Sequence, residues 1–147
     1  MCGRFAFGIP RKRLKERFGL GDIPEAPPRY NIAPGQLVEA VVQAEDGRRL
    51  KLLKWGLVPH WAKDPKIGYK MINARAETVA EKPSFRAAMR YRRCLVPAQG
   101  FYEWSRTSGK GEPWFITLST ESALAMAGLW EQYECHVVTD LSLVWTH

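Results

Sequence analysis

Two β-prone runs on either side of an Asp-Gly dipeptide are the feature that most constrains the fold. Residues 37–44 and 49–57 are rich in aliphatic side chains, and the dipeptide Asp46-Gly47 lies between them. An Asp-Gly pair in this position predicts a tight β-hairpin. A sheet that contains this hairpin is therefore the first element that we expect of the fold.

The rest of the chain adds more short strands and little helix. The pattern predicts a helix over 10–18, with proline at its start, glycines after its end, and a basic face that is solvated or turned to phosphate. It predicts a loop over 24–36, which holds four prolines, and a second short helix over 85–91. The other expected elements are strands at 2–8, 94–98, 101–104, 114–118 and 123–130, a loop at 59–67, an extended piece at 69–75, and a turn at 107–112.

This order predicts an α+β fold that is rich in β-structure, with barrel-like antiparallel sheets and a few short helices. No linker divides the chain, so we expect a single domain over 1–147. No apolar run approaches the roughly 20 residues that span a bilayer, and the N-terminus does not have the pattern of a signal peptide. Three cysteines are too few for a disulfide scaffold, which favours a reduced, cytoplasmic protein without a membrane partner.

The charge and the aromatic content narrow the class of partner. Lysine and arginine exceed the acidic residues to give a formal charge of +7, and 12% of the residues are aromatic, with six tryptophans. A basic domain of this kind is suited to a polyanion, although charge that serves only solubility is an equal alternative. The aromatic side chains favour single-stranded nucleic acid, because unpaired bases stack on aromatic faces while cations hold the phosphates.

Cys2 is the first candidate for chemistry. Removal of Met1 would leave an amine and a thiol on one residue. An α-amino group keeps a neutral fraction near physiological pH, unlike a lysine amine, and can attack an aldehyde to give a Schiff base. The thiol can then close a thiazolidine ring with the effective molarity of an intramolecular step. By itself, however, a cysteine at position 2 is more simply read as part of a frayed terminus.

Two other segments carry polar groups suited to this chemistry. In the segment 73–77, Asn73 and Arg75 would share one face of an extended strand, and each could also belong to an ordinary polar turn. Glu103 lies among three aromatic residues of the segment 100–104, where a carboxylate is suited to proton transfer, or simply faces solvent on an amphipathic strand. The segment 55–61 offers stacking surfaces, although for Trp55 a place in the core is the favoured interpretation.

Six ordered motifs make the chain resemble a known family. These are Met1-Cys2-Gly3-Arg4-Phe5, Tyr30-Asn31-Ile32-Ala33-Pro34, Trp55-Gly56-Leu57-Val58-Pro59, Asn73-Ala74-Arg75-Ala76-Glu77, Arg93-Cys94-Leu95-Val96-Pro97-Ala98 and Gly100-Phe101-Tyr102-Glu103-Trp104. With them the chain strongly resembles the SOS-response-associated peptidase (SRAP) family of abasic-site processing proteins. The resemblance runs from Met1 to about Glu131.

The resemblance implies a function and a set of residues. Such proteins bind single-stranded DNA, crosslink covalently to abasic sites and shield them, and are described as cysteine-type peptidases that remove their own Met1. By this resemblance Cys2 would be the nucleophile, Asn73 would position its amine and the sugar, and Glu103 would be the general acid and base. The implied DNA-binding residues are Arg4 and Arg75 for phosphates, and Pro34, Trp61 and Trp104 as walls for stacked or bent DNA.

The C-terminal part departs from the family pattern. Residues 131–147 do not resemble the family, and the His-x-Arg-Met-Pro segment that it carries is not found, so we expect a C-terminally shortened domain. Without that histidine, we expect crosslinks to form while their reversal and any lyase activity are impaired. His136 and His147 are candidates by residue type alone.

Two other functions stay open at this point. One is a non-catalytic module that binds single-stranded DNA, and the other is a cysteine-type peptidase that acts on other proteins. Neither a cofactor nor a metal is expected, because the chain has no nucleotide-binding loop and no Cys-x-x-Cys or His-x-x-x-His spacing. The expected partner is single-stranded DNA with abasic sites in the nucleoid, and no obligate protein partner is evident.

Overall fold

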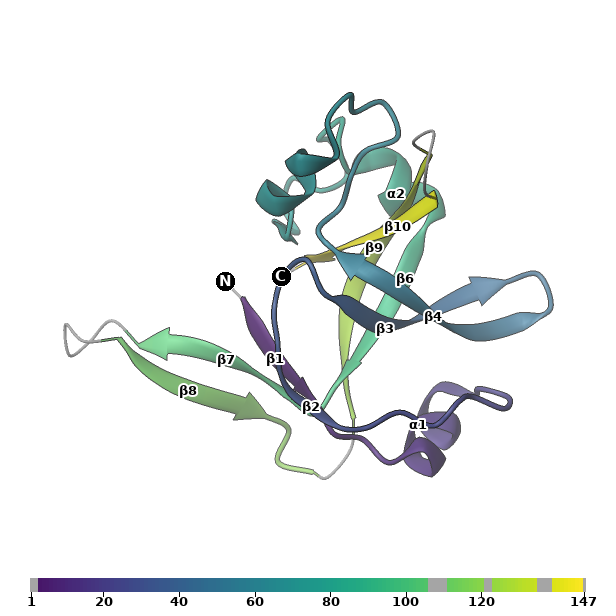
Figure 1. Cartoon of the computed structure of the whole chain (residues 1–147), viewed down its shortest axis with the longest axis vertical. Coiled ribbons are helices and arrows are strands. Elements are labelled where there is room, and N and C mark those ends of the chain that lie inside the picture. Colours follow the sequence, from purple (N-terminus) through teal and green to yellow (C-terminus); the bar gives the residue numbers. More distant parts are fainter. Residues whose placement is uncertain (1–2, 106–110, 121–122, 135–138, 147) are drawn as a thin grey trace.

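A computed structural model describes residues 3–105, 111–120, 123–134 and 139–146, and within them two sheets make up most of the fold (Figure 1). The first sheet has the order β2-β1-β7-β8 and the second β4-β3-β6-β9-β10-β5. The strands are β1 (Arg4–Phe7), β2 (Arg29–Ile32), β3 (Leu37–Ala44), β4 (Gly47–Trp55), β5 (Asn73–Ala74), β6 (Arg93–Ala98), β7 (Gly100–Ser105), β8 (Glu112–Thr117), β9 (Leu124–Glu134) and β10 (Thr139–Thr146). The helices are α1 (Arg11–Phe18), the 3₁₀ helix Pro65–Lys70, and α2 (Arg86–Tyr91). The expected β-rich α+β class is confirmed.

The second sheet curls back on itself. Strand β10 runs antiparallel to β9, and also pairs in parallel with β4 through Ser142↔Lys54 and Leu143↔Trp55. Pairing of β4 with both β3 and β10 joins the two sides of the sheet, which gives it a barrel-like curvature. Strand β10 also pairs in parallel with β5, so it holds a short segment from the middle of the chain at the sheet edge.

The predicted hairpin is formed by β3 and β4, with its turn one residue earlier than expected. Ala44 pairs with Gly47, so Glu45 and Asp46 make the turn and Gly47 begins β4. The φ angle of Gly47 is 129°, a conformation that other residues rarely adopt, which fixes glycine just after the turn.

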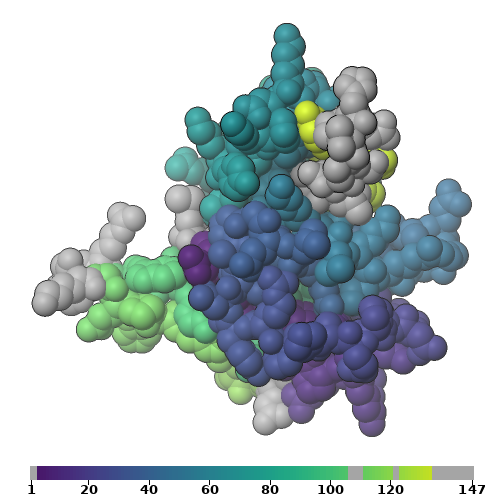
Figure 2. Space-filling model, in the orientation of Figure 1, coloured from purple at the N-terminus to yellow at the C-terminus, as the bar shows by residue number. Residues whose placement is uncertain are grey.

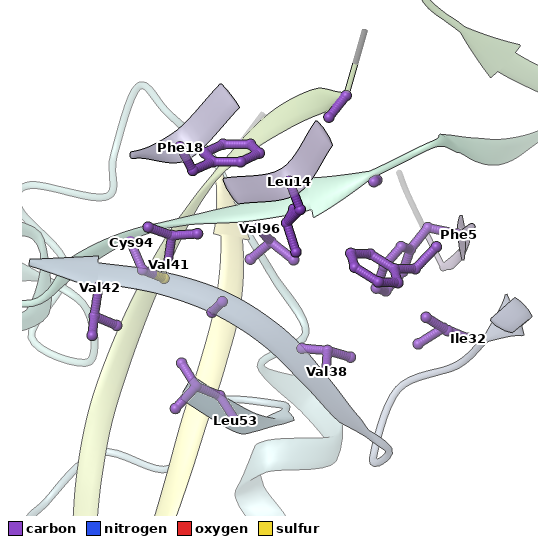
Figure 3. Close-up of a cluster of buried hydrophobic side chains, with 14 of the residues drawn as sticks. Phe5, Leu14, Phe18, Ile32, Val38, Val41, Val42, Leu53, Cys94 and Val96 are labelled. Carbon is purple, nitrogen blue, oxygen red and sulfur yellow. The ribbon is translucent and has the colours of Figure 1, made fainter. Parts of the chain in front are cut away.

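The core lies between the curled sheet, β1 and helix α1. Figure 3 shows Leu14 and Phe18 of α1 pointing toward Val41, Cys94 and Val96 of the sheet, with Phe5 and Ile32 at one end of the cluster. Helix α1 ends as expected at Gly19, whose φ of 62° gives a left-handed C-cap. The predicted core position of Trp55 is also confirmed, since the side chain is 1% exposed.

The basic face of α1 is not wholly solvated, and here the sequence-based expectation is wrong for Arg11. Its side chain is 8% exposed and donates two hydrogen bonds to the Glu39 carboxylate, at 2.6 and 2.7 Å. The guanidinium also lies 5.6 Å from the ring centre of Phe7. The bidentate partner on β3, the half-buried Glu39, therefore draws this arginine inward, while Lys12, Arg13 and Arg17 remain exposed.

Two loop predictions differ from the structure, and a third lies mostly outside the described residues. The segment 24–36 contains strand β2, which lies between the prolines and pairs with β1 through Phe5↔Ile32 and Phe7↔Arg29. The segment 59–67 leads into the 3₁₀ helix Pro65–Lys70, which Asp64 caps by accepting a hydrogen bond from the Lys66 N–H. Most of the turn predicted at 107–112 falls on residues 106–110, which lie outside the described residues. The described helices are too short or too polar to span a bilayer.

Candidate functional site

Three strands of the first sheet share a surface hollow. Arg4 of β1 is directly opposite Tyr102 of β7, and the alternation of a strand puts Trp104 on the same face. Asn31 reaches this face from β2, the neighbouring strand at the edge of the sheet. Gly3, Arg4, Tyr30, Asn31, Tyr102 and Trp104 line the hollow, which has a volume of about 480 Å³. In Figure 2 the first described residues, in purple, reach the surface between blue residues and the green residues of β7 and β8.

Hydrogen bonds hold the polar groups of the hollow in place. Arg4 Nη1 donates to Asn31 Oδ1 at 2.8 Å, and the Tyr102 hydroxyl donates to the Tyr30 carbonyl at 3.0 Å. The Tyr102 ring also packs against Phe115, with ring centres 5.0 Å apart. Trp104 is 47% exposed, so part of its indole face is open to a ligand. The hollow thus combines a cation, an amide and an accessible aromatic surface.

Glu103 lies on the other face of β7. It shares that face with Phe101, which pairs with the buried Phe5, and it pairs across the sheet with Trp114 of β8. Its side chain is half-buried. The structure therefore does not bring Glu103 into the hollow with Arg4 and Trp104, and the β7 backbone lies between them.

Asn73 is positioned by strand pairing and is half-buried. It pairs with Trp145 of β10, and the next residue, Ala74, pairs with Thr146. The chain leaves the strand at Arg75, whose carbonyl accepts hydrogen bonds from the N–H groups of Thr78 and Val79. The sequence predicts Asn73 and Arg75 on one face of an extended strand. Strand β5 ends before Arg75, so the alternation of a strand does not reach this residue, and its side chain is exposed.

Trp55 connects the segments that carry the predicted site residues. Its indole Nε1 donates to the Ile72 carbonyl at 2.9 Å, next to Asn73, and its ring meets Phe5 of β1 edge-on at 5.6 Å. Its backbone carbonyl accepts from the Gly35 N–H at 2.7 Å. One buried side chain and its backbone thus tie together β1, the Pro34 loop and β5. The sequence places Trp55 in the core, and this linking role comes only from the tertiary structure.

The remaining predicted residues lie on the surface. Trp61 follows the 55–59 motif and is 52% exposed, while Pro34 is half-buried in the loop between β2 and β3. Both positions are compatible with contact to a ligand, although no described hollow joins them to Trp104. Cys2, His136 and His147 lie outside the described residues. The residue that follows Cys2 in the sequence, Gly3, is in the lining of the hollow.

The described cysteine has no features of a reactive thiol. Cys94 is buried on β6, and burial raises the pKa of its thiol to about 12. The interpretation of Cys94 as a core thiol is therefore confirmed. Within the described ranges, no three His, Cys, Asp or Glu side chains gather in a way that would hold a metal ion.

Comparison with known proteins agrees with this architecture. The family model described as SOS response associated peptidase (SRAP) matches residues 1–144. The chain is 44% identical over 140 residues to the abasic site processing protein YoaM of Bacillus subtilis, covering 92% of this chain and 62% of YoaM. It is 32% identical over 135 residues to the abasic site processing protein YedK of Escherichia coli, covering 88% of this chain and 59% of YedK. The chain therefore spans less than two thirds of the length of these two relatives.

Solved structures share the fold. A protein from Bacteroides thetaiotaomicron superimposes with a TM-score of 0.87 at 22% identity, over 99% of this chain and 67% of that one. A protein from Bordetella bronchiseptica gives a TM-score of 0.84 at 24% identity, over 99% of this chain and 71% of that one. At these identities the likeness concerns the fold alone, and it extends over nearly the whole chain.

Proposed function

Because the chain belongs to the SOS response associated peptidase family, we propose that it binds single-stranded DNA at abasic sites and forms a covalent crosslink to them through Cys2. The observation that carries the proposal is the hollow that begins at Gly3, the residue after Cys2, and combines Arg4 with the exposed indole of Trp104. The names of the relatives, abasic site processing proteins, support the same lesion. On this proposal the protein acts in the cytoplasm on nucleoid DNA and needs no obligate protein partner.

The chemistry requires a free N-terminus. Hydrolysis of the Met1-Cys2 peptide bond, by the chain itself in this proposal, releases methionine and leaves the α-amine of Cys2. The amine attacks the open-chain aldehyde of the abasic sugar and expels water to form an imine. The Cys2 thiol then adds across the C=N bond: sulfur bonds to the former aldehyde carbon, and the thiol proton ends on nitrogen. The five-membered thiazolidine closes within one residue, so the step has a high effective molarity.

Four polar side chains serve this sequence of steps in the proposal. Asn73 positions the amine and the sugar, and its strand pairing supports a fixed orientation for this amide. Glu103 transfers protons during loss of water and ring closure in this proposal, from its half-buried place on β7, the strand that pairs with β1, on the face opposite the hollow. Arg4 and Arg75 hold phosphates beside the lesion as cations with several donors each.

Exposed rings supply the remaining contacts. Trp104 and Trp61 are each about half exposed, which supports their proposed role as surfaces for bases that stack or turn at the lesion. Pro34 would add a rigid wall, because the loop that carries it is hydrogen-bonded to Trp55.

Intact-mass measurement tests the proposal. Protein without Met1 is mixed with a single-stranded oligonucleotide carrying one abasic site, and with the same oligonucleotide carrying a normal base. We expect a heat-stable adduct only with the abasic strand, with a mass equal to protein plus DNA minus one water. Cys94→Ser is the matched control, because this buried thiol takes no part in the proposed reaction.

Replacement of Cys2 separates the alternatives. Cys2→Ala keeps an amine but no thiol, so its adduct should survive heat only after borohydride reduction of the imine. A Cys2→Ala protein that gives the same heat-stable adduct without reduction would refute the thiazolidine. DNA binding without any adduct would identify a non-catalytic binding module, and Cys2-dependent cleavage of unrelated proteins would identify a general peptidase.

A further inference from the structure

We propose that the hollow between β2, β1 and β7 holds one unpaired nucleobase next to the lesion, and that Asn31 selects a base whose edge carries carbonyl oxygens. This inference rests on the proposed binding of single-stranded DNA. It adds a specificity-determining residue to that function, and it concerns a base that remains in the strand rather than the abasic sugar.

Apolar walls suited to a planar ring form two sides of the hollow. Tyr102 and Trp104 are alternate residues on one face of β7, and alternate residues of a strand are separated by about 6.6 Å. The Tyr102 ring is fixed by its hydroxyl bond to the Tyr30 carbonyl and by its contact with Phe115. Trp104 keeps about half of its surface open. A fixed ring beside an open indole is an arrangement on which a base can stack.

The polar side of the hollow presents donors. Arginine can only donate, so its bond at 2.8 Å requires that Asn31 turn Oδ1 toward Arg4. The amide is rigid and planar, so the Nδ2 group points away from the guanidinium with its two N–H groups. Asn31 is exposed, which leaves this amide end accessible from solvent. A ligand that meets this side must therefore offer acceptors.

This donor pattern distinguishes between bases. Thymine carries carbonyl oxygens at both the 2 and the 4 position and no exocyclic amine. The acceptors of adenine on the corresponding edges are ring nitrogens, each of them flanked by the amine at position 6, which would face the amide donors. Cytosine lies between them, with one carbonyl and one amine. The hollow should therefore prefer thymine to adenine. A phosphate group would also satisfy the donors, but it would show no dependence on the base.

Equilibrium binding of short homopolymers tests the proposal. The affinities of the full chain for ten-nucleotide strands of thymidine, cytidine and adenosine are measured at one fixed salt concentration, since phosphate contacts depend on salt. One additional amide hydrogen bond predicts a preference for thymidine over adenosine of about fivefold. Asn31→Ala should reduce this ratio to nearly one. Asn31→Asp should reverse it, because a carboxylate accepts from the adenine amine.

Gln43→Ala provides the matched control. Gln43 is an exposed amide on β3, in the other sheet, where its side chain donates to the carbonyl of Ala44. Its removal should leave the ratio unchanged. Because strands of adenosine stack on themselves, the proposal is tested by the change of the ratio between variants rather than by the ratio of the wild type alone.

The outcomes separate this inference from the proposed function. A thymidine-to-adenosine ratio that is the same in wild type and Asn31→Ala overturns the base pocket. An equal loss of affinity for all three strands in Asn31→Ala also overturns it, in favour of a phosphate. If the abasic strand still crosslinks in either case, only the inference has failed. If no strand binds and no crosslink forms, the proposed function has failed, and the base pocket with it.

Discussion

The indole N–H of Trp55 should contribute measurably to the free energy of unfolding, because its hydrogen bond to the Ile72 carbonyl fixes the segment that carries Asn73. Trp55→Phe keeps an aromatic ring near Phe5 but removes the donor to the Ile72 carbonyl. Loss of a partner at a buried carbonyl costs about 1–3 kcal/mol. The smaller ring adds a cavity cost of about 1 kcal/mol. The free energy of unfolding should therefore fall by about 2–4 kcal/mol, a large share of the roughly 5–15 kcal/mol of a typical domain.

Urea denaturation measures this loss, and hydrogen exchange locates it. The Leu57 N–H donates to the Met71 carbonyl at 3.0 Å, beside the affected segment, so its exchange should accelerate more than that of amides in the β3–β4 hairpin. Trp61→Phe is the control, because Trp61 is 52% exposed and its replacement should change stability by less than about 0.5 kcal/mol. Equal stabilities of Trp55→Phe and Trp61→Phe would refute the reasoning.

Three further outcomes follow from buried and exposed groups. Glu39→Gln leaves the buried Arg11 guanidinium without its counter-charge and should lower the free energy of unfolding in urea by about 3 kcal/mol. Asp46→Asn removes one partner of an exposed ion pair and should have a much smaller effect, so similar losses in the two variants would contradict the burial argument. Because the pKa of the Cys94 thiol is raised to about 12, the folded state keeps a proton that the unfolded state loses above about pH 9, so stability should fall as pH rises through this interval. In a variant whose other two cysteines are serine, iodoacetamide should label this thiol only after denaturation, and equal labelling of the folded protein would disprove its burial. Ile116 is exposed on the edge strand β8, and Ile116→Lys places a charge on this apolar edge. The substitution should reduce self-association measured by light scattering. Unchanged scattering at high protein concentration would show that the β8 edge does not mediate self-association.

Local signals in the sequence were enough for the elements that neighbouring residues determine. The β3–β4 hairpin and helix α1 were predicted because an Asp-Gly pair, a starting proline and a closing Gly19 each act within a few residues. The turn was displaced by one residue, since an Asp-Gly pair allows more than one register and the pairing across the strands decides between them. Strand β2 was missed, because four residues between prolines carry little local preference for a strand.

The site depends on contacts between distant segments, which explains why less of it could be predicted. Arg4 and Trp104 were both named from the sequence, but only the pairing of β1 with β7 shows that they share a face while Glu103 does not. Asn31 belongs to one of the six sequence motifs, but the motif does not indicate which residue it faces, and its place in the hollow comes from the bond to Arg4. The sequence predicts Arg11 at the surface, because its neighbours in the chain do not indicate that the Glu39 carboxylate, 28 residues away, is its partner.

The pairing of β5 with β10 has a consequence for the order in which the protein can be completed during synthesis. Asn73 leaves the ribosome well before Trp145, its partner about 70 residues later. At about 5–20 residues per second, the ribosome needs several seconds to make that interval. Strand β1 and the β3–β4 hairpin emerge early, so the N-terminal cysteine is made long before the strand that fixes the amide. A nascent chain would thus present Asn73 without its pairing strand, and β5 would be fixed in the sheet only after β10 has been made.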